Sequence, residues 1–190
     1  MKVSKAAKFW IDYHKTHSKK NTVQSYQSVI ERFCQDFGDT EIEQVTPDDV
    51  LSFLNNFTNG NKPYTKRVRY SRMSAFFNFF RNNVDPEIGN PCDTPMIRKL
   101  YRERVVSRWE IIEKKTVDGI IFRTDKARNR LILELMARGG MRIGEVLKLR
   151  LIDIQDRKLI LREPKSGKEH EIVFIPQKVA DRLRSEKDSY

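Results

Sequence analysis

The chain has 190 residues, of which 37 are Lys or Arg and 26 are Asp or Glu, so its formal net charge is +11. This length allows one large domain or two small ones with cores of their own. The positive balance favours a polyanionic partner, and the lack of any apolar run of membrane-spanning length or apolar N-terminal leader favours nucleic acid over a membrane. We therefore expect a cytoplasmic protein that associates with nucleic acid. Cys34 and Cys92 are isolated cysteines, so we expect no disulfide framework, metal site or cofactor.

Apolar residues at helical spacing predict three amphipathic helices in the first part of the chain. They cover residues 3–17, 22–37 and 47–57. Thr46 before Pro47 is the N-cap and first-position pair that typically begins a helix.

A fourth predicted helix, residues 63–84, changes character along its length. Its second half carries an apolar stripe, whereas the stretch from Lys62 to Arg72 has five bases and no acid. The rear can pack in a bundle while the front presents long cations to phosphates. A solvated charged face remains the alternative. The DNA contacts expected here are Lys62, Tyr64, Thr65, Lys66, Arg67, Arg69 and Arg72.

Residues 85–94 are rich in Pro and Gly and break the helical periodicity. We predict a helical domain over 1–84, a basic linker over 85–105 and a second domain over 106–190. Arg102 and Arg104 in the linker are further expected DNA contacts. The second domain should begin with a helix over 106–115, for which Ser107 is the expected N-cap.

An arginine stands just beyond an apolar helix in the segment M-A-R-G-G-M-R-I-G-E-V-L-K-L-R-L-I-D-I, residues 136–154. The helix, predicted over 124–137 and expected to be buried, should end at the Gly pair. Glu145 follows Arg142 by three residues and can hold the guanidinium in one orientation, ready to bind phosphate with two parallel hydrogen bonds. The alternative is an ordinary surface pair.

Two short strands are predicted downstream, over 158–162 and 171–175, with P-K-S-G-K-E-H between them as a hairpin loop. Pro176 should end the second strand, and a helix should begin at Gln177.

The arginine segment resembles the first catalytic box of the tyrosine recombinases, the phage-type integrases and related site-specific DNA recombinases, whose pattern is T-G-x-R-x-(S/G)-E-(A/V/L)-x-x-L-x-(W/L)-x-D-(I/V). The resemblance implies that Arg142 is the first catalytic arginine and Glu145 its supporting acid. It also implies that the hairpin places a catalytic lysine in the minor groove. Lys165 matches that position best, and Lys168 is the alternative.

The same resemblance implies the fold and the partners. The expected fold is mainly α with a small β-hairpin: an N-terminal SAM-like four-helix bundle followed by a partial α/β catalytic domain. The expected partner is double-stranded DNA, on which the full-length protein would assemble as a homo-oligomer. The implied reaction cleaves and rejoins strands through a 3′-phosphotyrosine and uses no metal.

Two parts of the family pattern are missing from these 190 residues, namely the H-x-x-R box and the nucleophilic tyrosine, since Tyr190 follows no such box. We therefore expect a truncated recombinase that binds DNA and is inactive alone. The competing hypothesis is a non-catalytic helical DNA-binding regulator. It explains the charge equally well, but it does not explain the arginine box followed by a lysine-bearing hairpin.

Overall fold

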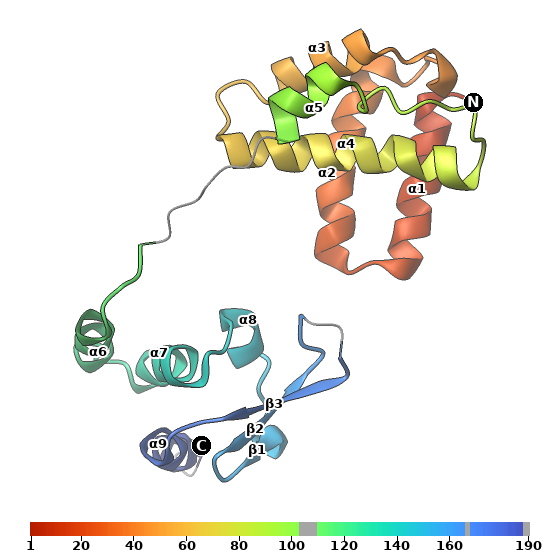
Figure 1. Cartoon of the computed structure of the whole chain (residues 1–190). Helices are drawn as coiled ribbons and strands as arrows, with labels where there is room; N and C mark the ends of the chain where they lie inside the picture. The colour runs from red at the N-terminus through yellow and green to blue at the C-terminus, as the bar shows by residue number, and fades with distance from the viewer. Residues whose placement is uncertain (103–109, 166–167, 188–190) are drawn as a thin grey trace. The chain divides into compact units, whose positions relative to one another are not determined.

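The computed structural model describes residues 1–102, 110–165 and 168–187. These fall into two compact units, one within Met1–Ser107 and the other within Arg108–Tyr190 (Figure 1). In the part of the chain that is described, no helix has the length and apolar character needed to cross a membrane.

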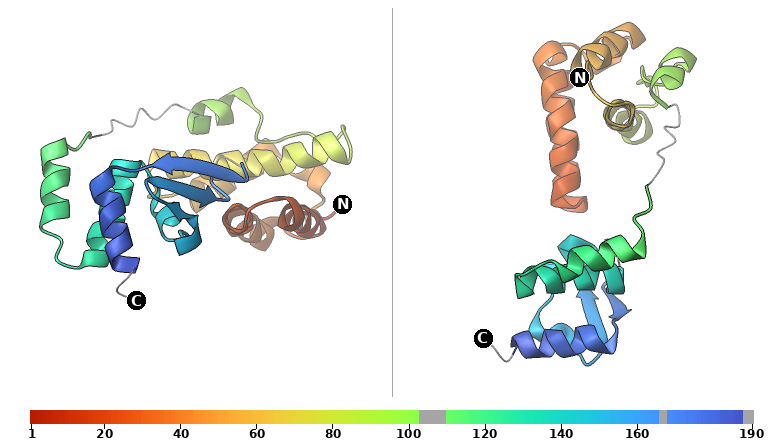
Figure 2. Two further views of the ribbon diagram at one scale, coloured as in Figure 1. Left: turned by 90° about the horizontal axis from the view of Figure 1, so that it is seen from below. Right: turned by 90° about the vertical axis from the view of Figure 1, so that its left-hand side faces the viewer.

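The N-terminal unit is helical. Helices α1 and α2 lie side by side, and the long helix α4 crosses both of them (Figure 1), a crossing that Figure 2 also shows with α4 nearly end-on. The elements are α1 Val3–His17, α2 Lys20–Phe37, the 3-10 helix η1 Ile42–Gln44, α3 Pro47–Phe57, α4 Pro63–Asn83 and α5 Pro95–Arg102.

Aromatic side chains fill the core of this unit. Trp10 of α1 and Phe33 of α2 meet the apolar half of α4, where Phe76, Phe77 and Phe80 are fully buried. Trp10 and Phe76 pack edge to face with centroids 5.4 Å apart, the geometry that ring quadrupoles favour. The predicted apolar stripe of the fourth helix is thus the centre of the core.

Residues 85–102 do not form the predicted linker. Ile88, Cys92, Ile97 and Tyr101 are all buried in the core of the N-terminal unit. The linker prediction is wrong over this stretch, because it took a Pro- and Gly-rich composition as a sign of extended chain. Residues 103–105, with Arg104, lie outside the described residues.

Hydrogen bonds that polar side chains make with one another and with the backbone hold residues 85–102 against α4. Asn90 donates from Nδ2 to the Ser74 carbonyl at 3.2 Å and to Asn78 Oδ1 at 2.8 Å, and its own Oδ1 accepts from the backbone N–H of Cys92. The Tyr70 hydroxyl donates to the Cys92 carbonyl at 3.2 Å. The N-terminal unit therefore has a fifth helix, α5, beyond the four expected.

The C-terminal unit contains a three-stranded antiparallel sheet in the order β1-β2-β3. Lys158 pairs with Phe174 and Arg162 with His170, so β2 and β3 form the predicted hairpin, to which β1 adds an unpredicted strand. The elements are α6 Lys114–Phe122, α7 Ala127–Gly139, α8 Ile143–Val146, the 3-10 helix η2 Leu151–Asp153, β1 Ile154–Gln155, β2 Lys158–Arg162, β3 His170–Phe174 and α9 Gln177–Lys187.

Helices α7 and α9 pack on one face of this sheet. Leu159 and Leu161 of β2 meet Leu135 of α7 and Val179 and Leu183 of α9 in a second apolar core. Alternate residues of β2 point into this core, as a half-buried strand requires.

Two helix predictions need correction here. Residues 110–113 of the helix predicted over 106–115 are not helical, and α6 begins at Lys114. Ile111 and Ile112 are exposed. Because they bury no apolar surface, no packing free energy offsets the entropy that is lost when a helix forms. Residues 106–109, with Ser107, lie outside the described part of the chain. Helix α7 is only partly buried, since of its residues only Glu134 and Leu135 are fully covered.

Candidate phosphate-binding and nucleic-acid-binding residues

Two glycines place Arg142 beside the sheet. A Cβ added to Gly139 would lie 3.3 Å from side-chain atoms of Val173 and Ile175, so a larger residue at the end of α7 would require these side chains to shift. Gly140 follows in the left-handed region with φ of 65°, which reverses the chain after the helix. Arg142 then stands in extended conformation at the start of α8.

Glu145 holds both the backbone and the side chain of Arg142. Its Oε2 accepts from the Arg142 backbone N–H at 2.9 Å, and its Oε1 accepts from Arg142 Nη1 at 2.9 Å. The Glu145 side chain is 12% exposed and that of Arg142 65% exposed. The acid is thus sheltered under a guanidinium whose other N–H groups can reach a ligand.

These hydrogen bonds also fix the charge state of the acid. The backbone N–H of Arg142, followed by its guanidinium, lowers the pKa of Glu145 below the ordinary carboxyl value. Glu145 is therefore ionised at neutral pH and orients a cation that can bind two oxygens of one phosphate. This is the pairing that the arginine segment predicted.

The hairpin carries the two candidate lysines. Lys165 and Lys168 are both exposed between β2 and β3, on either side of residues 166–167, which are not described. At the loop end of the hairpin, Lys148 lies 3.7 Å from Glu163 across a groove. The loop end of the hairpin therefore lies beside the segment that follows α8, although the two are more than ten residues apart in the sequence.

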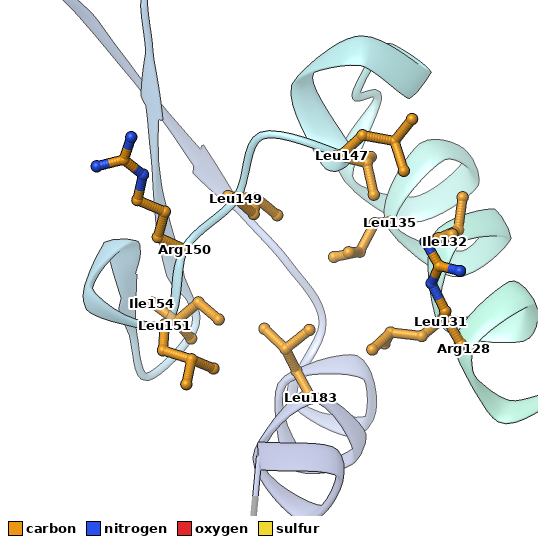
Figure 3. A pocket seen from close by; sticks show the side chains of 11 residues that line it. Arg128, Leu131, Ile132, Leu135, Leu147, Leu149, Arg150, Leu151, Ile154 and Leu183 are labelled. Atoms are coloured by element: carbon orange, nitrogen blue, oxygen red, sulfur yellow. The ribbon is translucent and has the colours of Figure 1, made fainter. Parts of the chain in front are cut away.

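A second, apolar groove adjoins this region and was not foreseen. Figure 3 shows leucines from α7, α9 and the α8–β1 segment converging on it, while the Arg150 side chain is directed away from them. Its volume is about 400 Å³. Its walls are mostly apolar, with Arg128 and Arg150 on opposite sides, so it mainly offers surface for packing.

The front of α4 presents the basic residues unequally. Lys62, Tyr64 and Arg67 are exposed, whereas Thr65 and Lys66 are half-buried. Lys62 and Pro63 begin the helix without an acid in its first turn. The outer surface of this helix end is thus positively charged.

Arg69 and Arg72 face inward more than the sequence indicates. The Arg69 guanidinium lies 4.0 Å from the centroid of the Phe57 ring and donates to the Phe57 carbonyl, at the end of α3. Burial lowers the pKa of Arg72. Arg69 therefore joins α3 to α4, a structural role that the run of bases did not reveal. Arg102 ends α5, and its side chain, like Arg104, lies outside what the structure describes.

Comparison with known proteins points to one family for both units. Residues 110–188 match the phage integrase family, and residues 2–58 match the phage integrase N-terminal SAM-like domain. The chain is 25% identical over 170 residues to the tyrosine recombinase XerC of Thermodesulfovibrio yellowstonii, which covers 86% of this chain and 54% of that protein. It is 27% identical over 191 residues to the TnP I resolvase of Bacillus thuringiensis, covering 94% of this chain and 65% of that protein.

Solved structures agree with this in fold. A lambda integrase dimer bound to a COC′ core site matches 99% of this chain and 70% of its own, with a TM-score of 0.74 and 18% identity. The Tn1549 transposon integrase in complex with circular intermediate DNA matches all of this chain and 66% of its own, with a TM-score of 0.71 and 17% identity. The chain thus spans between about half and two thirds of the curated relatives named above.

Proposed function

Because the chain belongs to the tyrosine recombinase family, also described as the phage integrase family, we propose that it binds double-stranded DNA as the N-terminal and first catalytic part of a site-specific recombinase. The observation that carries this proposal is the Arg142–Glu145 pair, in which a sheltered acid presents an exposed guanidinium in the same unit as a lysine-bearing hairpin. A simple DNA-binding regulator has no need of that arrangement.

In the proposed reaction a tyrosine attacks the scissile phosphate, forms a 3′-phosphotyrosyl bond and releases a 5′-hydroxyl. Arg142 neutralises the charge that builds on the non-bridging oxygens, and preorganised donors of this kind lower a barrier by a few kcal/mol or roughly 10²- to 10³-fold in rate. Lys165, or Lys168 in its place, donates a proton to the leaving 5′-oxygen. Both lysines are exposed on the hairpin, where they can reach DNA.

Residues 1–190 contain neither an H-x-x-R box nor a tyrosine that follows one. The covalent chemistry is therefore proposed for a protein that also carries those groups, and homo-oligomeric assembly on DNA is proposed for the same protein. For this chain by itself we propose DNA binding, with the front of α4 and the arginine box as contacts.

The test is duplex binding by the 190-residue chain, measured by fluorescence anisotropy over a range of salt concentrations. Changing Lys62, Lys66 and Arg67 together to Ala should weaken binding and lower the salt slope by about 0.9 for each phosphate that is no longer neutralised. The matched control removes three charges from the exposed surface of α1 and α2, as Lys5, Lys8 and Lys20 to Ala, and should change the slope less. Equal slopes for the two triple variants would remove α4 from the interface, and a wild-type chain that does not bind duplex DNA would overturn the proposal.

A further inference from the structure

A groove lies between residues 147–150 and the loop end of the β2–β3 hairpin, with a volume of about 610 Å³. Lys148 and Arg150 line it from the segment after α8, and Arg162 and His170 line it from the paired ends of β2 and β3. Glu163 and Glu169 also border it, so the net charge of the groove is small. Any preference for an anion must come from the geometry of its cations.

That geometry is set by one buried acid. Asp153 is 2% exposed, and its Oδ1 accepts from Arg162 Nε at 2.6 Å and forms an ion pair with Arg162 Nη2 at 2.6 Å. Its Oδ2 accepts from the backbone N–H of Arg150 at 3.2 Å. The guanidinium of Arg162 and the backbone that carries Arg150 are therefore fixed relative to each other by the same carboxylate.

The fixed guanidinium retains donors for a ligand. Arg162 is 43% exposed, and its Nη1 group is not engaged by Asp153. Arg150 is exposed, and Figure 3 shows its side chain directed away from the apolar groove. Arg162 and Asp153 thus repeat the arrangement of Arg142 and Glu145, an acid with little exposure that orients an accessible arginine.

We propose that this groove binds one phosphate of the DNA backbone through Arg150 and Arg162, and that Asp153 is the positioning residue for both. The inference rests on the proposed DNA-binding function and adds a contact that the arginine box did not predict. Two guanidinium groups that line one groove from separate elements match the several acceptor oxygens of a phosphodiester, whereas lysines would present point charges.

The first test uses a pair of substitutions that leaves the net charge unchanged. Asp153→Asn with Arg162→Gln removes one negative and one positive charge, so the formal charge stays at +11. The introduced Asn can still accept from the Arg150 backbone N–H and donate to the amide of the introduced Gln, so the local hydrogen bonds survive. We expect the salt slope for a 30-base-pair duplex, a length of about three helical turns, to fall by about 0.9 and affinity to fall about three- to tenfold. An unchanged isotherm from a folded variant would overturn the inference.

The second test uses Arg150→Ala, with Arg128→Ala as its matched control. Both remove an exposed arginine from the same unit, and Figure 3 shows the two on opposite sides of the apolar groove. Arg150→Ala should lower the slope by about 0.9 and Arg128→Ala should lower it less. When Arg150→Ala is combined with the charge-neutral pair, the salt slope should still fall by only about 0.9, because both changes remove the contact with the same phosphate.

Each result bears on one proposal or the other. If the decreases in salt slope add to about 1.8 in the combined variant, Arg150 and Arg162 contact two separate phosphates. That result would overturn the proposal of a shared site. Equal slopes for Arg150→Ala and Arg128→Ala would do the same, even if the charge-neutral pair did not fold. If the wild-type chain does not bind duplex DNA at all, the proposed function is wrong.

Discussion

Two acids, Glu145 and Asp153, decide how the arginines of the C-terminal unit are presented. Each accepts from an arginine guanidinium and from the backbone N–H of an arginine three residues before it. The pKa of Glu145 is lowered chiefly by the Arg142 backbone N–H, and that of Asp153 chiefly by the Arg162 side chain. Both acids therefore favour the folded state in their ionised form.

The sign of the pH dependence follows from these shifts. The unfolded chain holds its carboxyl protons at higher pH than the folded chain does, so the stabilisation is complete above the ordinary values of 4.5 for Glu and 3.8 for Asp and is lost as pH falls below them. In thermal melts between pH 3 and 7, the midpoint temperature of unfolding should decrease towards the acid end of this range. Glu145→Gln should flatten that fall, and Glu171→Gln, in the same unit, serves as the control. An equally steep fall in Glu145→Gln would contradict the assignment.

At the scale of the element, α4 shows how one helix serves a core and a charged surface. Its rear buries Phe76, Phe77 and Phe80, while its front exposes Lys62 and Arg67. Arg69 stands between these two regions and contacts the end of α3. The bases along this helix thus divide into those available to a ligand and one that holds the fold.

Arg69→Ala should therefore destabilise the N-terminal unit, whereas Arg67→Ala should not. Arg69→Ala removes a charged hydrogen bond to the Phe57 carbonyl and a cation–π contact with the Phe57 ring. Together these should lower the free energy of unfolding by about 1 to 3 kcal/mol. Urea unfolding followed by circular dichroism measures the difference. Similar midpoints for the two variants would show that Arg69 contributes no more than a surface arginine.

At the scale of the whole molecule, the division of the chain into units differs from the one that composition indicated. Tyr101 of α5 stacks on Tyr70 of α4, with centroids 5.7 Å apart, and its hydroxyl donates to Asn55 of α3 at 2.7 Å. The stretch after α4 therefore completes the N-terminal core.

A fragment that ends at residue 84 should be much less stable than one that ends at residue 107. It lacks Ile88, Ile97 and Tyr101, and each buried side chain of this size contributes about 1.5 to 3 kcal/mol. That loss is comparable with the whole stability of a small domain, about 5 to 15 kcal/mol. Urea midpoints and amide proton dispersion of the two fragments would measure it. Equal midpoints would restore the boundary at residue 84.

Features that arise from neighbouring residues could be predicted without the fold. Helical periodicity gave the bounds of α3 and the apolar rear of α4, and alternation gave the β2–β3 hairpin. The spacing of Arg142 and Glu145 gave their pairing, because residues three apart on a helical turn are neighbours. The resemblance of the arginine box to the first catalytic box of the tyrosine recombinases indicated the family from the sequence alone.

Contacts between residues that are distant in the chain could be seen only once the chain is folded. Composition could not show that Asn90 bonds to α4, that Arg69 lies on Phe57, or that Arg162 reaches Asp153 across the sheet. In each case a polar or charged side chain has a partner whose position is set by packing rather than by spacing. A run of bases records how many cations a helix carries, and the folded chain decides which of them remain available to a phosphate.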